Sequence, residues 1–98
     1  MDFEAEWRGD VLRLTGELDM AAVERFEAAA LTAMDHSDLV IDLGELAFID
    51  SSGIRSLMKV ARGVEPCRLR LRSPAAAVRK VIDLTGIADA ADNITVEV

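Results

Sequence analysis

The first part of the chain alternates between apolar and polar residues in two short segments. The apolar positions of these segments are Phe3, Ala5, Trp7, Leu12 and Leu14. Strict alternation is typical of strands with one buried face, and the intervening Gly9-Asp10 is a frequent turn pair. The pattern predicts a β-hairpin over residues 3–15, with Trp7 on the core side.

Helical spacing of apolar residues replaces this alternation further along the chain. It predicts a first helix over residues 20–34, with the carboxylate of Asp19 as its N-cap. A second helix is predicted to begin near Ser51 and to stop at about Gly63. A buried strand over residues 39–43 is expected between these two helices.

The segment between that strand and the second helix contains Gly44-Glu45, which suggests a turn. After this turn, three apolar residues are expected to lead the chain back into the core. They are Leu46, Phe48 and Ile49.

The last third of the chain repeats the strand–helix–strand order. Residues 67–72 alternate between apolar side chains and the arginines Arg68, Arg70 and Arg72. Ser73-Pro74 then predicts an N-cap followed by a first-turn proline, and Gly86 predicts a left-handed helix end. A short turn or helical piece and an edge strand over residues 94–98 complete the pattern.

Helices between strands require crossover connections and mostly parallel pairing. Four of the five predicted strands alternate, whereas strands covered on both faces are apolar throughout. The chain is therefore predicted to be one α/β domain over residues 1–98. It should have a mixed, mostly parallel sheet of about five strands, with helices on one face.

Composition narrows the class of protein. The chain has 98 residues, of which 51% are hydrophobic and 4% aromatic, and its net charge is −7. Such an acidic chain is poorly suited to nucleic acid, which binds basic surfaces. No apolar run is long enough to cross a bilayer, the first residues do not resemble a signal peptide, and Cys67 has no disulfide partner. We expect a cytoplasmic protein that does not insert into membranes.

The strongest candidate site is the tetrapeptide Asp50-Ser51-Ser52-Gly53, where a predicted strand passes into a helix. Aspartate and serine are common N-caps, so ordinary capping explains the segment from the residues alone. A helix N-terminus also attracts anions, so a serine there can carry a phosphate. Arg55, one turn later, is placed to support such a group. Both interpretations are open at this stage.

Several segments together resemble the STAS domain, and more narrowly bacterial anti-sigma factor antagonists. The matching segments are 16–19 (Gly-Glu-Leu-Asp), 42–53, 73–75 (Ser-Pro-Ala) and 84–87 (Leu-Thr-Gly-Ile), in order over nearly the whole chain. The family often has another glycine soon after Ser-Ser-Gly, whereas here Ile54-Arg55 follows Gly53. This departure bears on the identity of the partner more than on the fold.

The resemblance implies a phosphorylation-controlled protein switch. It implies that Ser51, with Ser52 as the alternative, is phosphorylated by an anti-sigma factor that is itself a serine kinase of the histidine-kinase-like ATPase fold. The unphosphorylated antagonist binds this kinase and so releases a sigma factor, and a phosphatase resets the switch. The expected partner-binding residues are Asp19, Asp50, Ser51, Ser52, Gly53 and Arg55.

Catalysis is not expected from these residues. A nucleophilic serine needs a base, and the chain has one histidine, His36, in a predicted polar loop. The acidic residues are dispersed, and neither His36 nor Cys67 has clustered metal-ligand neighbours. We therefore predict no enzyme activity, no cofactor and no metal.

The arginine stripe has two interpretations. Arg68, Arg70 and Arg72 suggest a surface for nucleic acid or an acidic partner, but cross-strand pairing with Glu4, Glu6 or Glu97 is the interpretation we favour. Cys67 is expected to be a small buried strand residue.

A second function fits the same family. STAS subunits of ABC-type lipid transport systems dock on an ATPase subunit and need no phosphorylation. They more often carry threonine and glycine in the 50–53 segment, so the serines here favour the antagonist.

Overall fold

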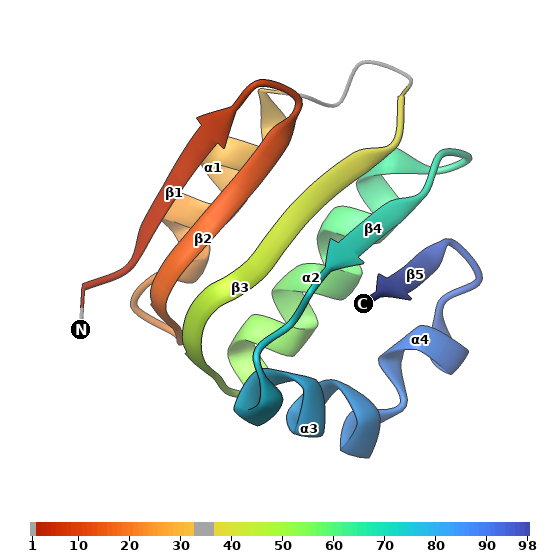
Figure 1. The fold of residues 1–98 in the computed structure, drawn as a ribbon. Helices are drawn as coiled ribbons and strands as arrows, with labels where there is room; N and C mark the ends of the chain where they lie inside the picture. Colours follow the sequence, from red (N-terminus) through yellow and green to blue (C-terminus); the bar gives the residue numbers. More distant parts are fainter. Residues whose placement is uncertain (1, 33–36) are drawn as a thin grey trace.

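The computed structural model describes residues 2–32 and 37–98. In these residues the strands form one five-stranded sheet whose spatial order equals the order along the chain (Figure 1). The strands are β1 (Glu4–Arg8), β2 (Val11–Leu18), β3 (Leu39–Ile49), β4 (Leu69–Arg72) and β5 (Ile94–Glu97). The helices are α1 (Val23–Leu31), α2 (Ser51–Val64), α3 (Ala76–Thr85) and α4 (Ile87–Ala90).

The sheet is mixed, as the sequence predicts. β1 and β2 form an antiparallel hairpin, and β2, β3, β4 and β5 pair in parallel. The predicted class, an α/β domain with a mixed, mostly parallel five-stranded sheet, is therefore confirmed. No described helix is long and apolar enough to span a membrane.

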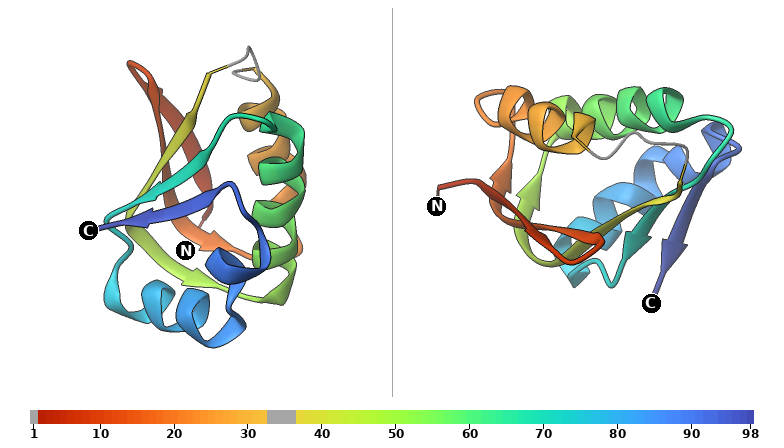
Figure 2. Two further views of the ribbon diagram at one scale, coloured as in Figure 1. Left: turned by 90° about the vertical axis from the view of Figure 1, so that its right-hand side faces the viewer. Right: turned by 90° about the horizontal axis from the view of Figure 1, so that it is seen from above.

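The helices close the core from two directions. α1 and α2 lie side by side across one face of the sheet, and α3 and α4 lie at the end where β3 passes into α2 (Figures 1 and 2). There α3 packs against β3, and α4 contacts β5. The core between these layers is aliphatic apart from Phe3, Phe26 and the half-buried Trp7.

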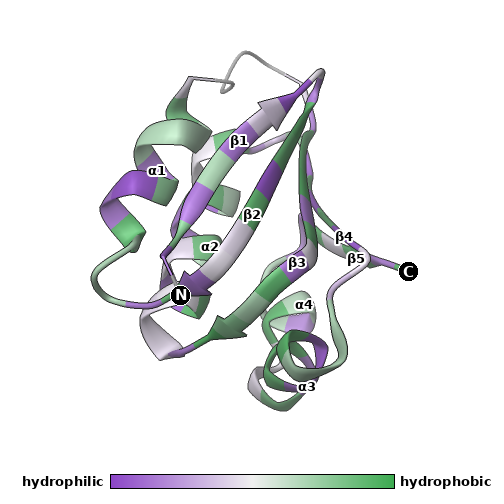
Figure 3. Ribbon diagram, turned by 60° about the vertical axis from the view of Figure 1, so that its left-hand side comes forward, coloured by the Kyte–Doolittle hydropathy of each residue, from purple (hydrophilic) through white to green (hydrophobic). Residues whose placement is uncertain are grey.

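Hydrophilic and hydrophobic residues alternate along the strands (Figure 3), and the buried positions of β2 and β4 are the apolar ones. Arg70 pairs with Glu97 at 2.7 Å and Arg72 approaches the same carboxylate at 3.8 Å. Arg68 instead donates to Thr95 Oγ1 at 3.0 Å. The predicted pairing with Glu97 is thus confirmed for Arg70 and Arg72. The interpretation was wrong for Arg68, which precedes β4 and donates to Thr95 and the carbonyl of Asp92 instead of a glutamate.

The central strand β3 corrects the prediction of a turn at Gly44-Glu45. β3 continues through both residues and pairs with β2 along its length, and two register shifts insert extra residues on β3. Each such bulge advances the side-chain alternation by one position. Buried residues therefore recur at Leu43, Leu46 and Ile49, as predicted for the last two. Phe48 was expected in the core but is 46% exposed.

Two predicted helix caps were also wrong. α1 begins at Val23 rather than next to Asp19, and its N-cap, Ala22, has no side-chain cap. Asp19 instead forms the turn before the helix, where its Oδ1 and carbonyl oxygen accept from the N–H groups of Ala21 and Ala22 at 3.1 and 3.0 Å. The predicted end of this helix at residue 34 lies outside the described residues.

Ser73-Pro74 does not start α3 either. Ser73 has a φ of 51°, and its N–H donates to the carbonyl of Glu97 at 2.7 Å, so it extends the strand pairing of β4 with β5. The N-cap of α3 is Ala75, again without a side-chain cap. At the other end, the prediction for Gly86 is confirmed, since it is the C-cap of α3 with a φ of 66°.

Two smaller boundaries differ from the prediction. α2 does not stop at Gly63 but continues to Val64, which is buried, so one more apolar contact favours the extra residue. Cys67 precedes β4 and is half-buried, rather than a buried strand residue.

Candidate functional site

The candidate site lies where β2 and β3 end side by side. The last residues of these strands, Leu18 and Ile49, are paired across the sheet. Asp19 and Asp50 follow them directly, and the N–H of Asp50 donates to the carbonyl of Leu18 at 3.4 Å. The parallel pairing therefore brings two aspartates, 31 positions apart in the sequence, to one edge of the sheet.

Asp50 is the N-cap of α2. Its backbone is extended, with φ −113° and ψ −172°, and its Oδ1 accepts from the N–H groups of Ser52 at 2.9 Å and Gly53 at 3.1 Å. These are two of the donors that a helix leaves unpaired at its start. The carboxylate also places a negative charge at the positive end of the helix dipole. The capping part of the sequence interpretation is thereby confirmed.

The two serines after the cap differ in their surroundings. Ser51 is the first residue of α2 and is exposed, and none of the described residues hydrogen-bonds to its side chain. Ser52 is half-buried and lines the groove between α1 and α2. The hydroxyl of Ser51 is thus the more accessible of the two to another protein.

Gly53 allows α2 to start close to the sheet. A Cβ on this residue would lie 2.6 Å from both Ile49 Cγ1 and the carbonyl oxygen of Leu18. The residue is buried, so it acts in packing and offers no side chain to a partner. Its expected part in partner binding stays a prediction.

Arg55 is exposed on the second turn of α2. It lines the same α1–α2 groove as Ser52, and it makes no ion pair or hydrogen bond to a described residue. Its guanidinium group is therefore free to meet an added anion near the start of the helix.

Comparison with known proteins gives the class of this domain. The family model described as "Mlab, STAS domain" matches residues 1–96. The chain belongs to the STAS domain family.

Similar proteins of the family include a curated anti-sigma F factor antagonist of Lysinibacillus sphaericus. It is 35% identical to this STAS domain over 82 residues, which cover 79% of this chain and 70% of that protein. The resemblance stated from the sequence is confirmed.

Solved structures match the same fold. The unphosphorylated anti-sigma factor antagonist SpoIIAA has a TM-score of 0.71 and 30% identity, covering 97% of this chain and 87% of that one. An anti-sigma factor antagonist from Mycobacterium paratuberculosis has a TM-score of 0.78, covering 98% and 84%, and its 24% identity makes it evidence for the fold alone.

A polar cluster that the sequence did not predict lies beside the candidate site of this STAS domain. Ser56, 3% exposed, donates from Oγ to Glu27 Oε2 at 2.7 Å, and Lys59 Nζ donates to Glu27 Oε1 at 3.0 Å. The Ser56 hydrogen bond, helped by Lys59, lowers the pKa of Glu27 below its usual value, although burial opposes this. A serine four residues after Ser52, within an apolar helix stripe, was the signal that could have found the cluster.

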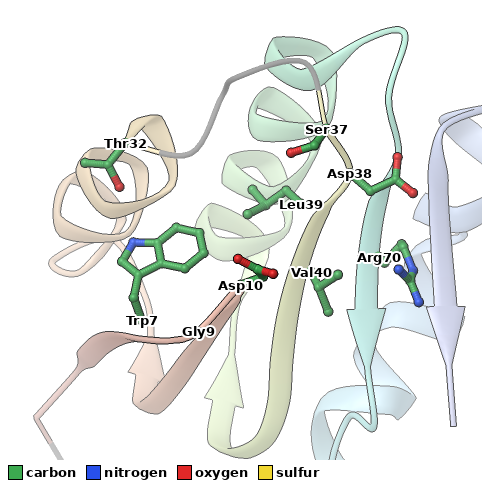
Figure 4. A pocket seen from close by; sticks show the side chains of 9 residues that line it. All are labelled: Trp7, Gly9, Asp10, Thr32, Ser37, Asp38, Leu39, Val40 and Arg70. Carbon is green, nitrogen blue, oxygen red and sulfur yellow. The ribbon is translucent and has the colours of Figure 1, made fainter.

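The opposite end of the sheet carries a separate hollow (Figure 4). It lies near the hairpin turn and the start of β3, and the side chains of Trp7, Asp38 and Arg70 line it. These groups already have partners: Trp7 Nε1 donates to Ala29 O at 3.3 Å, Asp38 accepts from Arg68 N at 2.9 Å, and Arg70 pairs with Glu97. Trp7 packs against the core as predicted.

Two other predicted features concern chemistry. His36, interpreted as a polar loop residue, lies outside the described residues. Among residues 2–32 and 37–98, no three histidine, cysteine or carboxylate side chains gather as a metal site would require.

Proposed function

We propose that this STAS domain is an anti-sigma factor antagonist switched by phosphorylation of Ser51. In the unphosphorylated state it binds an anti-sigma factor that is a serine kinase, and a sigma factor is released. The similarity to the anti-sigma F factor antagonist of Lysinibacillus sphaericus supports this proposal. The proposed partners are cytoplasmic, so the switch would operate in the cytoplasm.

The observation that carries the proposal is that the exposed hydroxyl of Ser51 lies next to a helix cap that Asp50 already occupies. Ser51 is exposed at the first turn of α2, and the carboxylate of Asp50 already accepts from the N–H groups of Ser52 and Gly53. A phosphate on Ser51 cannot use those two donors while Asp50 holds them. The new charge is added to that of Asp50 and faces outward, toward the partner.

The chemical step is an ordinary phosphoryl transfer. The kinase brings ATP, the bond between the β,γ-bridging oxygen and the γ-phosphorus breaks, and a bond forms from Ser51 Oγ to that phosphorus. The hydroxyl proton passes to a base of the kinase, and ADP leaves. A phosphatase reverses the state by hydrolysing the phosphoserine, which returns Ser51 and inorganic phosphate.

The change in charge is large enough to end binding. A phosphoserine carries about −1.5 to −2 charges near neutral pH. An interface formed around a neutral hydroxyl must then hold like charges or an unpaired buried charge, which costs several kcal/mol. Because about 1.4 kcal/mol corresponds to a tenfold change in affinity, we expect binding to weaken by roughly a hundredfold or more.

The experiment is incubation of the purified chain with anti-sigma factor serine kinases from its source and ATP. Mass spectrometry then maps the phosphate, and calorimetry measures binding before and after. Ser51→Ala should bind but resist phosphorylation, and Ser52→Ala is the matched control that should be phosphorylated normally. Ser51→Asp should weaken binding partly, because it adds less charge. A phosphate on neither serine, or tight binding by the phosphorylated chain, contradicts the proposal.

The transporter-associated function makes the opposite prediction. A STAS subunit that docks on an ATPase of a lipid transport system would bind that ATPase whether or not Ser51 carries a phosphate. Binding to such an ATPase together with no phosphorylation by any kinase would replace the antagonist proposal.

A further inference from the structure

The groove between α1 and α2 is continuous with the Ser51 site. Met20 and Val23 line it on the α1 side, and Ser52, Arg55 and Lys59 line it along one face of α2. Ser52 directly follows Ser51, so a partner that covers Ser51 also reaches this groove.

The groove is basic, although the whole chain is acidic. The single carboxylate lining it, that of Glu27, is engaged by Ser56 Oγ at 2.7 Å and by Lys59 Nζ at 3.0 Å. Arg55 has no partner among the described residues, and the side chain of Lys59 remains 69% exposed. Lys59 balances the charge of Glu27, so Arg55 leaves the groove with one unpaired positive charge in a chain whose net charge is −7.

The groove also offers an apolar contact. Met20 is 73% exposed although methionine is usually buried, and it lies in the turn that follows Asp19. Methionine is flexible and polarizable, so it adapts its shape to an incoming apolar side chain. Arg55 and the exposed Met20 can together bind a segment in which an acidic side chain lies close to an apolar one.

We propose that this groove binds an acidic, partly apolar segment of the anti-sigma factor, with Arg55 pairing with its carboxylate and Met20 contacting its apolar side chain. The inference rests on the proposed function. It adds a second element to the switch, because Arg55 is one helical turn from Ser51. A phosphate on Ser51 attracts this arginine and so removes a cation from the partner's carboxylate.

The test uses the kinase found by the phosphorylation assay and the unphosphorylated chain. Calorimetry compares Arg55→Glu with Lys80→Glu, the same charge change on the exposed side of α3. It also compares Met20→Ala with Leu84→Ala, since Leu84 is 77% exposed on α3. We expect roughly a tenfold to hundredfold loss of affinity for Arg55→Glu and about tenfold for Met20→Ala. The two α3 variants should stay within about twofold of wild type.

A second measurement follows the ¹³C-methyl resonance of Met20 in labelled protein as the kinase is added. We expect the chemical shift of this resonance to change as the complex forms. An unchanged chemical shift in a sample where calorimetry shows binding overturns the inference. Equal affinities of groove and α3 variants also overturn it while leaving the proposed function intact.

Two further outcomes separate the inference from its alternatives. If wild type binds no kinase, both proposals fail. If sedimentation shows a dimer of the chain that Arg55→Glu dissociates, a second copy occupies the groove and the inference is wrong. Unchanged denaturation midpoints would show that the variants remain folded.

Discussion

The N-termini of α2 and α3 differ although each helix follows a parallel strand and a serine or aspartate. Asp50 is extended and accepts two helix N–H groups, whereas Ser73 lies in the left-handed region and caps nothing. At the third helical position, α2 has Gly53, which has no room for a Cβ, and α3 buries Val78. The start of α2 is therefore closely fixed to the sheet edge, while that of α3 is held by its apolar side chains.

The difference supports the proposed phosphate switch at the start of α2. A tightly packed, capped helix start holds the exposed Ser51 hydroxyl in one place for a partner. The cap also occupies the N–H groups that would otherwise absorb an added phosphate, so the charge acts on the interface. At α3, whose start lacks a side-chain cap, the same modification would find free donors.

Among the variants that test this comparison, Gly53→Ala is expected to change the stability of the protein the most. Its Cβ would meet Ile49 Cγ1 and the carbonyl of Leu18 at 2.6 Å, and the backbone oxygen cannot move away without disturbing β2. We expect about 3 kcal/mol lower stability, at the upper end of overpacking costs. Denaturant unfolding measures it.

Gly63→Ala is the matched control, because this glycine is exposed in the same helix. It should raise stability by about 0.5–1 kcal/mol, since alanine is the better helix former. If Gly53→Ala behaves like Gly63→Ala, the close approach of α2 to the sheet is wrong.

Asp50→Ala tests how much the side-chain cap of α2 contributes to stability. Loss of the bonds to Ser52 and Gly53 should cost about 1 kcal/mol, whereas Ser73→Ala should change stability by less than about 0.5 kcal/mol. Asp50→Asn keeps a capping oxygen and removes the charge. If this variant is stable but loses partner binding, the charge of Asp50 belongs to the docking surface. Equal losses for Asp50→Ala and Ser73→Ala would remove the distinction between the two helix starts.

Glu27→Gln gives the smallest expected effect, about 0.5 kcal/mol at neutral pH. The folded pKa of Glu27 is lowered by Ser56 and Lys59, so its ionised form stabilises the fold. That stabilisation is complete above the unfolded pKa, near the ordinary value of 4.5, and is lost as the pH falls through the lower folded pKa. Stability measured from pH 7 to pH 3 should therefore fall less in Glu27→Gln than in wild type.

Local patterns predicted much of this fold correctly. The alternation around Gly9-Asp10 gave the hairpin, and the left-handed glycine at Gly86 gave the end of α3, because both depend on neighbouring residues alone. The turn expected at Gly44-Glu45 was wrong. A glycine marks a turn or a bulge equally well, and the choice depends on pairing with β2, which is distant in sequence.

The candidate site was predictable only in part for the same reason. The cap by Asp50 follows from the strand–helix boundary, and the structure has it as expected. The polar cluster of Glu27 with Ser56 and Lys59 connects α1 and α2, whose relative placement is set by the sheet. Asp19 looked like a helix cap, but the turn that it forms delays α1 by three residues.

The order of the strands has a consequence for how the chain reaches its folded state. Because β1 to β5 lie in the order in which they are synthesised, each new strand meets the edge left by the one before it. No strand has to wait for a later one or insert between two that are already paired. We expect pairing to begin with the β1–β2 hairpin, because local contacts form faster than distant ones. During translation the nascent domain would then add strands at one edge only, and β5 would join the sheet after the other four.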